Sequence, residues 1–396
     1  MLPEGPADDH GGVSAAPPAI DPAPIIQLGL GAGLDAVGVA DVEPFDEARA
    51  EIERRRDAGM HAGMAFTFRN PARSTDPRVT MPGARTLVVG ALRYDRVPRP
   101  EHPPEPAGRV ARYSWVDHYG TLRSALTEIA GRLRTDGWSA MVLADDNALV
   151  DRAAAHRAGL GWFGKNANLL MPGQGSWCVL GSVLTDAPFT PQAQPQPDGC
   201  GSCTRCIDGC PTGAIVAPGV VDARRCLAWL VQAPGTFPHD HREALGDRIY
   251  GCDDCQEVCP PNRRLSRQGD DTVRRLEPGG DSSTVEAWVP LLDLLAASDD
   301  ELIARHGRWY IPQRQPAYLR RNALLALANT ADASDPEVVA AIAAALADPD
   351  PIIRSHAVWA ARRLGLIGLV ELVAGDTDPL VAAEVAAPPP AVRNSS

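Results

Sequence analysis

The sequence predicts an α/β region, a cysteine-rich region and an all-helical region, in that order along the chain. Apolar strand-like runs alternate with helical patterns from about residue 25 to residue 189, eight of the nine cysteines fall between residues 200 and 259, and the chain becomes rich in Ala and Leu after about residue 283. A chain of 396 residues is long enough for about two or three domains. Hydrophobic residues make up 44% of it, which excludes wholesale disorder.

The α/β prediction rests on three segments. Residues 85–92 and residues 139–144 are apolar enough for buried strands, and residues 119–133 have the periodicity of an amphipathic helix. We assign this domain to residues 25–189 and expect a disordered Pro- and Ala-rich leader at residues 1–24. The Pro-rich stretch that follows, residues 188–198, reads as a linker.

The helical prediction rests on Asp-Pro pairs that begin helices. Asp350 and Asp378 each precede a Pro, and the segment around Arg320 resembles the segment around Arg354, 34 residues later. This spacing is typical of HEAT-like helical repeats, which bury their apolar faces by stacking. The predicted boundaries are residues 190–275 for the cysteine-rich domain, residues 276–387 for the helical domain and residues 388–396 for a frayed tail.

The cysteine spacing predicts two iron–sulfur clusters. Residues 200–211 read C-x2-C-x2-C-x3-C-P, the pattern of bacterial ferredoxins, and residues 252–260 repeat its later part. In such runs the Cys before Pro ligates the other cluster. The crossed assignment gives Cys200, Cys203, Cys206 and Cys259 to one [4Fe-4S] cluster, and Cys210, Cys226, Cys252 and Cys255 to the other.

Two structural zinc sites are the alternative, because eight thiolates could also make two tetrahedral sets. Zinc sites usually pair one C-x2-C motif with another, whereas three thiols here arrive within seven residues and a fourth precedes Pro. The 26-residue step from Cys226 to Cys252 contains an insertion with Trp229, Phe237 and His239, which we expect to form a surface feature.

Two adjacent clusters can transfer electrons along a short path, and this path needs a further redox centre that accepts the electrons. No G-x-G-x-x-G follows a strand in the α/β region, so a dinucleotide site has little support. Lys165 after Gly164 is not a phosphate-binding loop, because the required upstream Gly and the following Ser or Thr are missing. We expect Gly159, Gly161 and Gly164 to let the backbone approach a flat ligand.

Residues 144–181, together with the cysteine run after them, closely resemble epoxyqueuosine reductases. These are cobalamin-dependent iron–sulfur enzymes that complete queuosine in the anticodon loop of tRNA. The run from Gly159 to Asn166 and the double cluster run are highly specific, and the resemblance covers about residues 25–330. It implies a cobalamin-binding α/β domain, a ferredoxin-like double-cluster domain and a C-terminal helical repeat domain. One departure is Asp117-His118-Tyr119, where the family commonly shows Asp-Tyr-His.

The resemblance also implies roles for individual residues. Asp145 is the implied proton donor, and Arg69 or Arg73 is the arginine that approaches the corrin. Deoxygenating an epoxide to an alkene consumes two electrons and two protons, so the donor carboxyl needs a pKa raised above ~3.9 to stay protonated near neutral pH. An external one-electron donor such as a flavodoxin or ferredoxin would supply the electrons. Besides Arg69 and Arg73, the implied cofactor-binding residues are Asp145, Lys165, Asn166, Asn168 and Leu169.

A net charge of −12 argues against binding nucleic acid, yet only the local charge must be positive. Residues 302–331 contain five Arg, interleaved aromatic residues and no Asp or Glu, a composition suited to pairing with phosphates and stacking on unpaired bases. A second basic segment follows the clusters. The predicted RNA contacts are Arg305, Arg308, Arg314, Arg320 and Arg321, with Trp309, Tyr310 and Tyr318 between them, and the second segment holds Arg263, Arg264, Arg267, Arg274 and Arg275.

Two other functions remain open at the level of sequence. A corrinoid reductive dehalogenase shares the implied cofactors, but such proteins usually carry an export signal, which is not seen here. A ferredoxin-like electron carrier with a helical docking module would bind no corrinoid. We expect a soluble cytoplasmic monomer, because no run approaches the roughly 18 apolar residues of a membrane helix and the acidic start does not look like a secretory signal.

Overall fold

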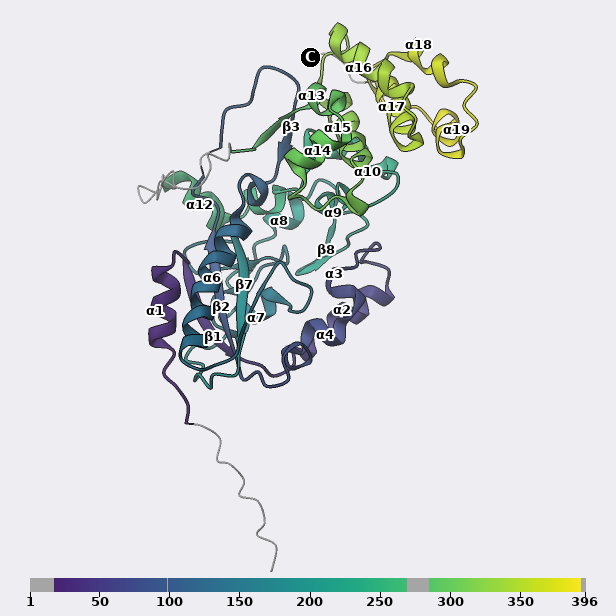
Figure 1. The fold of residues 1–396 in the computed structure, drawn as a ribbon. Helices are drawn as coiled ribbons and strands as arrows, with labels where there is room; N and C mark the ends of the chain where they lie inside the picture. Colours follow the sequence, from purple (N-terminus) through teal and green to yellow (C-terminus); the bar gives the residue numbers. More distant parts are fainter. Residues whose placement is uncertain (1–17, 98, 269–284, 393–396) are drawn as a thin grey trace, which may run out of the picture.

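The computed structural model describes residues 18–97, 99–268 and 285–392. Figure 1 shows the α/β part at the bottom, elements of the cysteine-rich part in the middle and the C-terminal helices at the top. Of the expected leader, residues 1–17 lie outside the described residues. The chain beyond them is already paired, because Ile20 forms a bridge with Phe189 and helix α1 begins at Ala23.

A four-stranded sheet forms the centre of the α/β part, in the order β1-β2-β7-β4 with every neighbour antiparallel. Its strands alternate between two cores: Val88 packs on the face covered by α1 and α6, and Leu87 and Val89 pack on the face covered by α7. The predicted strands and the predicted helix are thereby confirmed. Their bounds are β1 Ala36–Asp41, β2 Thr86–Arg93, β4 Ala140–Ala144, β7 Cys178–Thr185, α1 Ala23–Gly31, α6 His118–Thr135 and α7 Asp151–Arg157.

Short elements flank this sheet and connect it to the rest of the chain. On the α/β side these are α2 Asp46–Asp57, α3 Phe66–Arg69, α4 Pro71–Thr75, α5 Pro77–Thr80, β5 Trp162–Phe163 and β6 Leu169–Leu170. The cysteine-rich part contains α8 Arg205–Asp208, β8 Ile215–Ala217, β9 Val220–Val221, α9 Leu227–Leu230, α10 His239–Leu245, β10 Arg248–Tyr250, α11 Asp254–Glu257 and α12 Pro260–Gln268.

A second sheet joins the three parts of the chain. Strand β3 (Ala107–Val110) lies between β10 and β11 (Trp288–Pro290), parallel to the first and antiparallel to the second. Each strand comes from a different predicted domain, so the sheet fixes all three relative to one another. Periodicity alone does not reveal such a sheet, because each strand is only three or four residues long.

The C-terminal part is helical, as predicted. Asp350 and Asp378 each cap a helix by accepting a backbone hydrogen bond, and Asp335 does the same one helix earlier. Helix α15 packs on α17, and α17 packs on α16 and α19. The helices are α13 Leu291–Ala296, α14 Asp299–His306, α15 Ala317–Thr330, α16 Pro336–Leu346, α17 Pro351–Arg363, α18 Ile367–Val370 and α19 Pro379–Ala386, with 3-10 turns at Arg112–Ser114, Pro312–Arg314 and Glu371–Val373.

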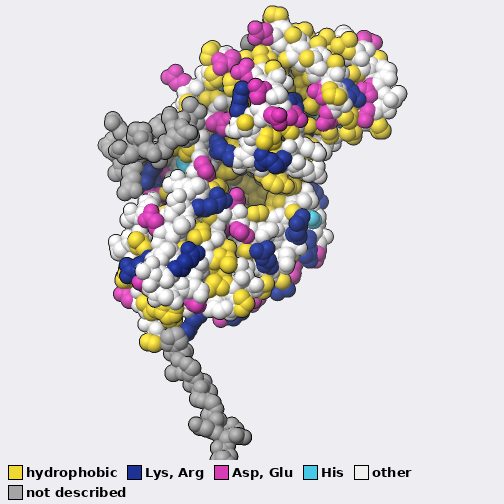
Figure 2. Space-filling model, in the orientation of Figure 1, with side chains coloured by type: hydrophobic (Ala, Val, Ile, Leu, Met, Phe, Trp, Pro, Cys, Tyr) yellow, Lys and Arg dark blue, Asp and Glu magenta, His cyan; other side chains and the backbone are white. Residues whose placement is uncertain are grey.

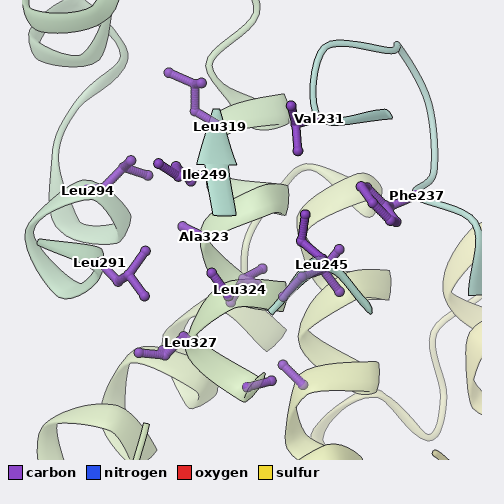
Figure 3. Close-up of a cluster of buried hydrophobic side chains, with 14 of the residues drawn as sticks. Val231, Phe237, Leu245, Ile249, Leu291, Leu294, Leu319, Ala323, Leu324 and Leu327 are labelled. Atoms are coloured by element: carbon purple, nitrogen blue, oxygen red, sulfur yellow. The ribbon is translucent and has the colours of Figure 1, made fainter. Parts of the chain in front are cut away.

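The insertion between Cys226 and Cys252 is not a surface feature, contrary to the expectation from sequence. Its residues Val231, Phe237, Leu245 and Ile249 interdigitate with the C-terminal helices, as Figure 3 shows, and Phe237 is 1% exposed. The insertion is therefore the platform on which the helical part packs. The core continues across the boundary that we assigned at residue 275.

Candidate functional site

The eight clustered thiols fall into two groups in space. Burial, together with the three leading thiols of the first run, raises the pKa of Cys259 to about 11. Burial also raises the pKa of Cys255 well above the ordinary thiol value, and the thiols that add to this effect are Cys252, Cys226 and Cys210, along with the Asp253 carboxyl. The groups are Cys200, Cys203, Cys206 and Cys259, and Cys210, Cys226, Cys252 and Cys255.

Backbone amides at helix starts and turns support these thiols. Helix α8 packs on α11, which brings the first cysteine run against the last. The Ala214 amide donates to Cys210 Sγ at 3.2 Å, and Cys226 caps α9. All nine cysteines are free thiols. Among the described residues, no three His, Cys, Asp or Glu side chains converge closely enough to hold a single metal ion.

Asp145 lies directly after β4, on a loop with strained backbone. Its φ is +54°, a left-handed conformation that is uncommon for residues other than Gly and often marks functional sites. The side chain is exposed at one side, yet enough protein surrounds it for burial to raise its pKa. The charge of Asp146 raises the pKa further, and Arg123 opposes both. The net effect is a pKa of Asp145 above the ordinary carboxyl value, the direction that a proton donor requires.

The charges of this loop also act on two further titratable side chains, Asp151 and Tyr119. Burial raises the pKa of Asp151 well above its usual value, and the charges of Asp145 and Asp146 add to this effect. Burial also raises the pKa of Tyr119, again with contributions from Asp145 and Asp151. The negative charges of Asp145 and Asp151 therefore disfavour ionisation of the Tyr119 hydroxyl.

Asp117-His118-Tyr119, in which His and Tyr are in the reverse of the usual family order, forms the start of α6. Asp117 caps α6 by accepting from the Gly120 amide at 2.8 Å. His118 is buried next to Tyr94, and burial lowers its pKa to about 4, so it stays neutral. The order found here directs the histidine into the core and the tyrosine toward Asp145.

Of the two candidate arginines, Arg73 is tied to the Asp145 loop. Its Nη1 donates to Asn147 Oδ1 at 3.3 Å, and the neighbouring Ser74 hydroxyl donates to the Asn147 carbonyl at 2.5 Å. Arg69 is exposed at the end of α3. Helices α3 and α4 therefore present one arginine fixed against the loop and one facing solvent.

The segment from Lys165 to Leu169 touches both cysteine groups. Lys165 Nζ donates to the carbonyl of Gly201 at 2.6 Å, beside the first group, and Asn166 Nδ2 donates to the carbonyl of Cys255 at 3.4 Å, in the second. Asn168 is half-buried and Leu169 is buried in the β5–β6 hairpin. This segment is the junction between the α/β part and the cluster loops.

The glycines of this segment do not serve the purpose that we expected. A Cβ on Gly161 would lie 2.2 Å from the carbonyl oxygen of Leu170, and one on Gly164 would lie 2.2 Å from the Leu170 side chain. A Cβ on Gly159 would lie 2.5 Å from Ala193 of the linker. The expectation of a ligand approach is wrong, because the space beside each glycine is filled by the protein itself.

The residues predicted to contact RNA differ in their exposure to solvent. Arg321 is wrong as a contact, because it is 0% exposed and its guanidinium donates to backbone carbonyls of the insertion. Trp309 and Tyr318 are also buried and cannot stack on a base. Tyr310 is 55% exposed and stays available. Among the remaining arginines, Arg305, Arg308 and Arg314 are exposed, whereas Arg320 is half-buried and paired with Asp299.

The second basic segment is partly described. Arg263 and Arg264 are exposed on α12, immediately after Cys259. The side chain of Arg267, and both Arg274 and Arg275, lie outside the described residues.

Figure 2 shows a recess with hydrophobic side chains between the lower α/β part and the upper helical part, with Lys and Arg side chains around it. Two buried polar atoms at the junction with the cysteine-rich part have no hydrogen-bond partner among the described residues: His61 Nδ1 and Trp162 Nε1. The segment of His61 is bound to the cysteine-rich part, because Trp229 Nε1 donates to the Ala62 carbonyl at 3.1 Å. A recess with apolar walls suits a large ligand.

Known proteins resemble this chain over most of its length. A family model described as a 4Fe-4S double cluster binding domain matches residues 199–262, and one described as epoxyqueuosine reductase QueG, DUF1730, matches residues 74–146. The epoxyqueuosine reductase of Bacillus cereus is 34% identical over 351 residues, which cover 86% of this chain and 88% of that protein. The chain belongs to the epoxyqueuosine reductase family. The Pseudomonas aeruginosa epoxyqueuosine reductase is 34% identical and covers 87% of this chain.

Solved epoxyqueuosine reductases have the same fold. One, in complex with an epoxyqueuosine-modified tRNA-Tyr stem loop, matches with a TM-score of 0.81 and 30% identity over 92% of this chain and 96% of that chain. Another, from Bacillus subtilis with its catalytic aspartate loop swung out of the active site, matches with a TM-score of 0.80 and 29% identity, at the same coverage. Membership of the epoxyqueuosine reductase family makes this chain an oxidoreductase. None of the described helices is both long and apolar enough for a membrane span.

Sequence reasoning missed several neighbours of the site. Tyr113, which is partly buried, and Tyr250, which is buried, lie side by side with ring centroids 6.2 Å apart, and the charge of Asp145 raises the pKa of Tyr250 in addition to the larger effect of burial. Asn147 anchors Arg73, and Arg123 opposes the raised pKa of Asp145. Tyr113 and Asn147 lie in segments that carry the family resemblance. No sequence pattern marks Tyr250 or Arg123.

Proposed function

We propose that this protein reduces epoxyqueuosine to queuosine at the wobble position of tRNA. The observation that carries the proposal is Asp145, a carboxyl with a raised pKa on a strained loop, in a chain of this family. Work on tRNA is cytoplasmic, and we expect the protein to act as a monomer. The decisive experiment incubates reconstituted protein and a chemical reductant with epoxyqueuosine stem-loop RNA, followed by mass spectrometry of the nucleosides. Absence of queuosine would overturn the proposal.

Two [4Fe-4S] clusters and cobalamin are the proposed cofactors. The two thiol groups supply four ligands each, which suits two cubanes. The apolar recess suits a flat corrin. The unpartnered His61 and Trp162 nitrogens at the junction with the cysteine-rich part are free to bond to its peripheral amides. Arg69 or Arg73 and the segment from Lys165 to Leu169 would hold it, with Arg73 favoured by its bond to Asn147. An absorption spectrum with added cobalamin tests this directly, since a simple electron carrier would show cluster bands only.

Bound cobalamin would supply two electrons, received one at a time from the clusters. The reaction converts an epoxide, two electrons and two protons into an alkene and water. Asp145 donates its proton to the epoxide oxygen as the carbon–oxygen bond opens. Burial raises the pKa of Asp145, the charge of Asp146 adds to this effect and Arg123 opposes it, so the net shift favours the protonated form. Tyr119 lies beside the carboxyls and, because its pKa is raised, remains a neutral hydrogen-bond donor.

The crossed ligand sets make a specific prediction for double variants. Cys203→Ser and Cys259→Ser each remove a ligand of the same proposed cluster, so either single variant and the double variant should all retain about four iron atoms per chain. Cys203→Ser combined with Cys255→Ser should lose both clusters. Iron and sulfide analysis of anaerobically purified protein measures this. Loss of all iron in the Cys203→Ser, Cys259→Ser double variant would contradict the crossed sets, and zinc in place of iron would contradict clusters altogether.

The revised RNA surface consists of the exposed loop after α14. Tyr310 projects from it, and its backbone amide donates to the Tyr250 hydroxyl at 2.8 Å, which anchors the loop beside the site. Gln313 and Arg314 both have positive φ, which shows that the loop is held in a strained conformation. We propose that Tyr310 stacks on an unpaired base while Arg305 and Arg314 pair with phosphates, and that Arg308 and Arg320 contribute less because Glu286 and Asp299 engage them.

Replacing Tyr310 by Ala should weaken binding of the stem-loop by about 1–3 kcal/mol, the usual contribution of base stacking. Arg314→Gln should weaken binding and also flatten its dependence on salt, because one phosphate contact is lost. Fluorescence anisotropy at several salt concentrations measures both effects. Arg132→Gln, an exposed residue near the end of α6, is the matched control. Unchanged affinity in the Tyr310→Ala variant would remove this loop from the interface.

We further propose that the C-terminal helices form a short HEAT-like array. The successive packing of α15 on α17 and of α17 on α19 supports this, as does the Asp-Pro start that α16, α17 and α19 share. Such an array would hold the loop after α14 at a fixed distance from Asp145.

A further inference from the structure

The two thiol groups differ in their access to solvent. Five of the seven residues from Gly199 to Arg205, the loop of the first group, are exposed. In contrast, none of the eight residues from Ile249 to Gln256, which carry Cys252 and Cys255, is exposed. A partner protein can therefore approach the first group closely, whereas the loop of Cys252 and Cys255 is covered.

The second group is bound to the α/β part of the chain. The Arg112 amide donates to Oδ2 of Asp253, between Cys252 and Cys255, at 2.7 Å, and Asn166 Nδ2 donates to the Cys255 carbonyl at 3.4 Å. Gly251, directly before Cys252, packs against Ala111 and Tyr113, where an added Cβ would lie 2.5 Å from Ala111. The order from solvent inward is then the loop of the first group, the second group and the α/β part that contains Asp145. Electrons that enter from outside have a defined point of entry.

The exposed side of the first group carries positive charge, although the whole chain is at −12. Arg205 is exposed on α8, and Arg263 and Arg264 are exposed on α12, whose Arg263 amide donates to the Cys259 carbonyl at 3.0 Å. Lys165 lies beside Gly201. Among the described residues, two exposed carboxylates lie there as well, Asp198 and Asp208, whereas Glu257 pairs with Arg99 and Arg109, so the four cations outnumber the unpaired anions.

We propose that the loop from Gly199 to Arg205, together with the start of α12, is the docking surface for an acidic one-electron carrier protein. The carrier loses one electron at each encounter and the first cluster gains it, so two encounters supply the two electrons that one epoxide requires. This inference rests on the proposed function and names the partner of the same site. It reassigns Arg263 and Arg264 from RNA binding to electron entry. Complementary charge raises association rates steeply at low salt, which makes the surface testable by kinetics.

The test follows reduction of the clusters in the reconstituted full-length protein by stopped-flow absorbance, with reduced flavodoxin as the acidic carrier. The double variant Arg263→Glu, Arg264→Glu should lower the second-order rate constant by at least about tenfold at low ionic strength and flatten its salt dependence. The matched control reverses the same number of charges elsewhere, with Arg132→Glu and Arg134→Glu near the end of α6, and should leave the rate within about twofold.

Three outcomes would overturn the docking surface: an unchanged rate with flavodoxin, an equal loss in both double variants, or weaker binding of the anticodon stem-loop as the main effect of the α12 variant. Photoreduction with deazaflavin, a small reductant, keeps this inference separate from the proposed function. If the photoreduced α12 variant makes queuosine normally while its rate with flavodoxin is unchanged, only the docking surface fails. If photoreduced wild-type protein makes no queuosine, the proposed function fails.

Discussion

Replacing Asp145 by Asn should lower the turnover of epoxyqueuosine stem-loop RNA by about 10²–10⁴-fold, the range that a positioned proton donor contributes. The amide keeps the shape of the side chain but has no proton to give to the opening epoxide. Iron content, cobalamin binding and RNA affinity should remain unchanged, because none of the thiols or arginines contacts this side chain through a hydrogen bond in the described residues. Single-turnover assays with photoreduced protein measure the effect. Turnover above about a tenth of the wild-type rate would remove Asp145 from the proton transfer.

Asp146→Asn is the matched control, and it carries a pH prediction. The donor must be protonated, so the rate is maintained below the pKa of Asp145 and falls as the pH rises through it. Because the charge of Asp146 raises the pKa of Asp145, removing that charge should lower the pKa and move the alkaline fall to lower pH. The Asp146→Asn variant should therefore be active at acidic pH and lose activity earlier on the alkaline side. A shift in the opposite direction would contradict the assignment.

Replacing Arg321 by Met should lower the free energy of unfolding by about 3 kcal/mol. The guanidinium donates to the carbonyls of Leu230, Val231, Ala233 and Gly235 in the insertion. Each carbonyl left unpaired in the core costs about 1–3 kcal/mol, and relief from burying a charge offsets part of the total. Burial lowers the pKa of Arg321 to about 9, which reflects that cost. Urea denaturation followed by circular dichroism measures the change.

Arg320→Met provides the comparison one residue away. Arg320 pairs with Asp299 at 2.6 Å near the surface, so its loss should cost less than about 1 kcal/mol. The Arg321 variant should also release iron from the second thiol group before the first, because Cys226 and Cys252 flank the insertion that Arg321 holds. Equal stability of the two variants, or release of iron from the first group first, would contradict this account.

Arg320 and Arg321 illustrate what could not be predicted from the sequence. Adjacent residues on a helix point about 100° apart, so Arg320 and Arg321 face different surroundings although they look equivalent in the sequence. Trp309 and Tyr310 are also adjacent, in the loop after α14, and Trp309 is in the core whereas Tyr310 is exposed to solvent. Charge and aromatic content identified the region, but the helical register and the position of the insertion decided which side chains remain available.

The cysteine spacing, the strands β2 and β4 of the central sheet, helix α6 and the Asp-Pro helix starts were determined by the sequence alone. Each depends on contacts between residues near in the chain or on a ligand pattern written into the spacing itself. The tertiary structure decided the rest: the three-stranded sheet that joins the parts, the buried insertion, the glycine packing and the tyrosines beside Asp145. These depend on contacts between side chains and segments that meet only when the chain folds, and no local pattern encodes which surface a side chain will meet.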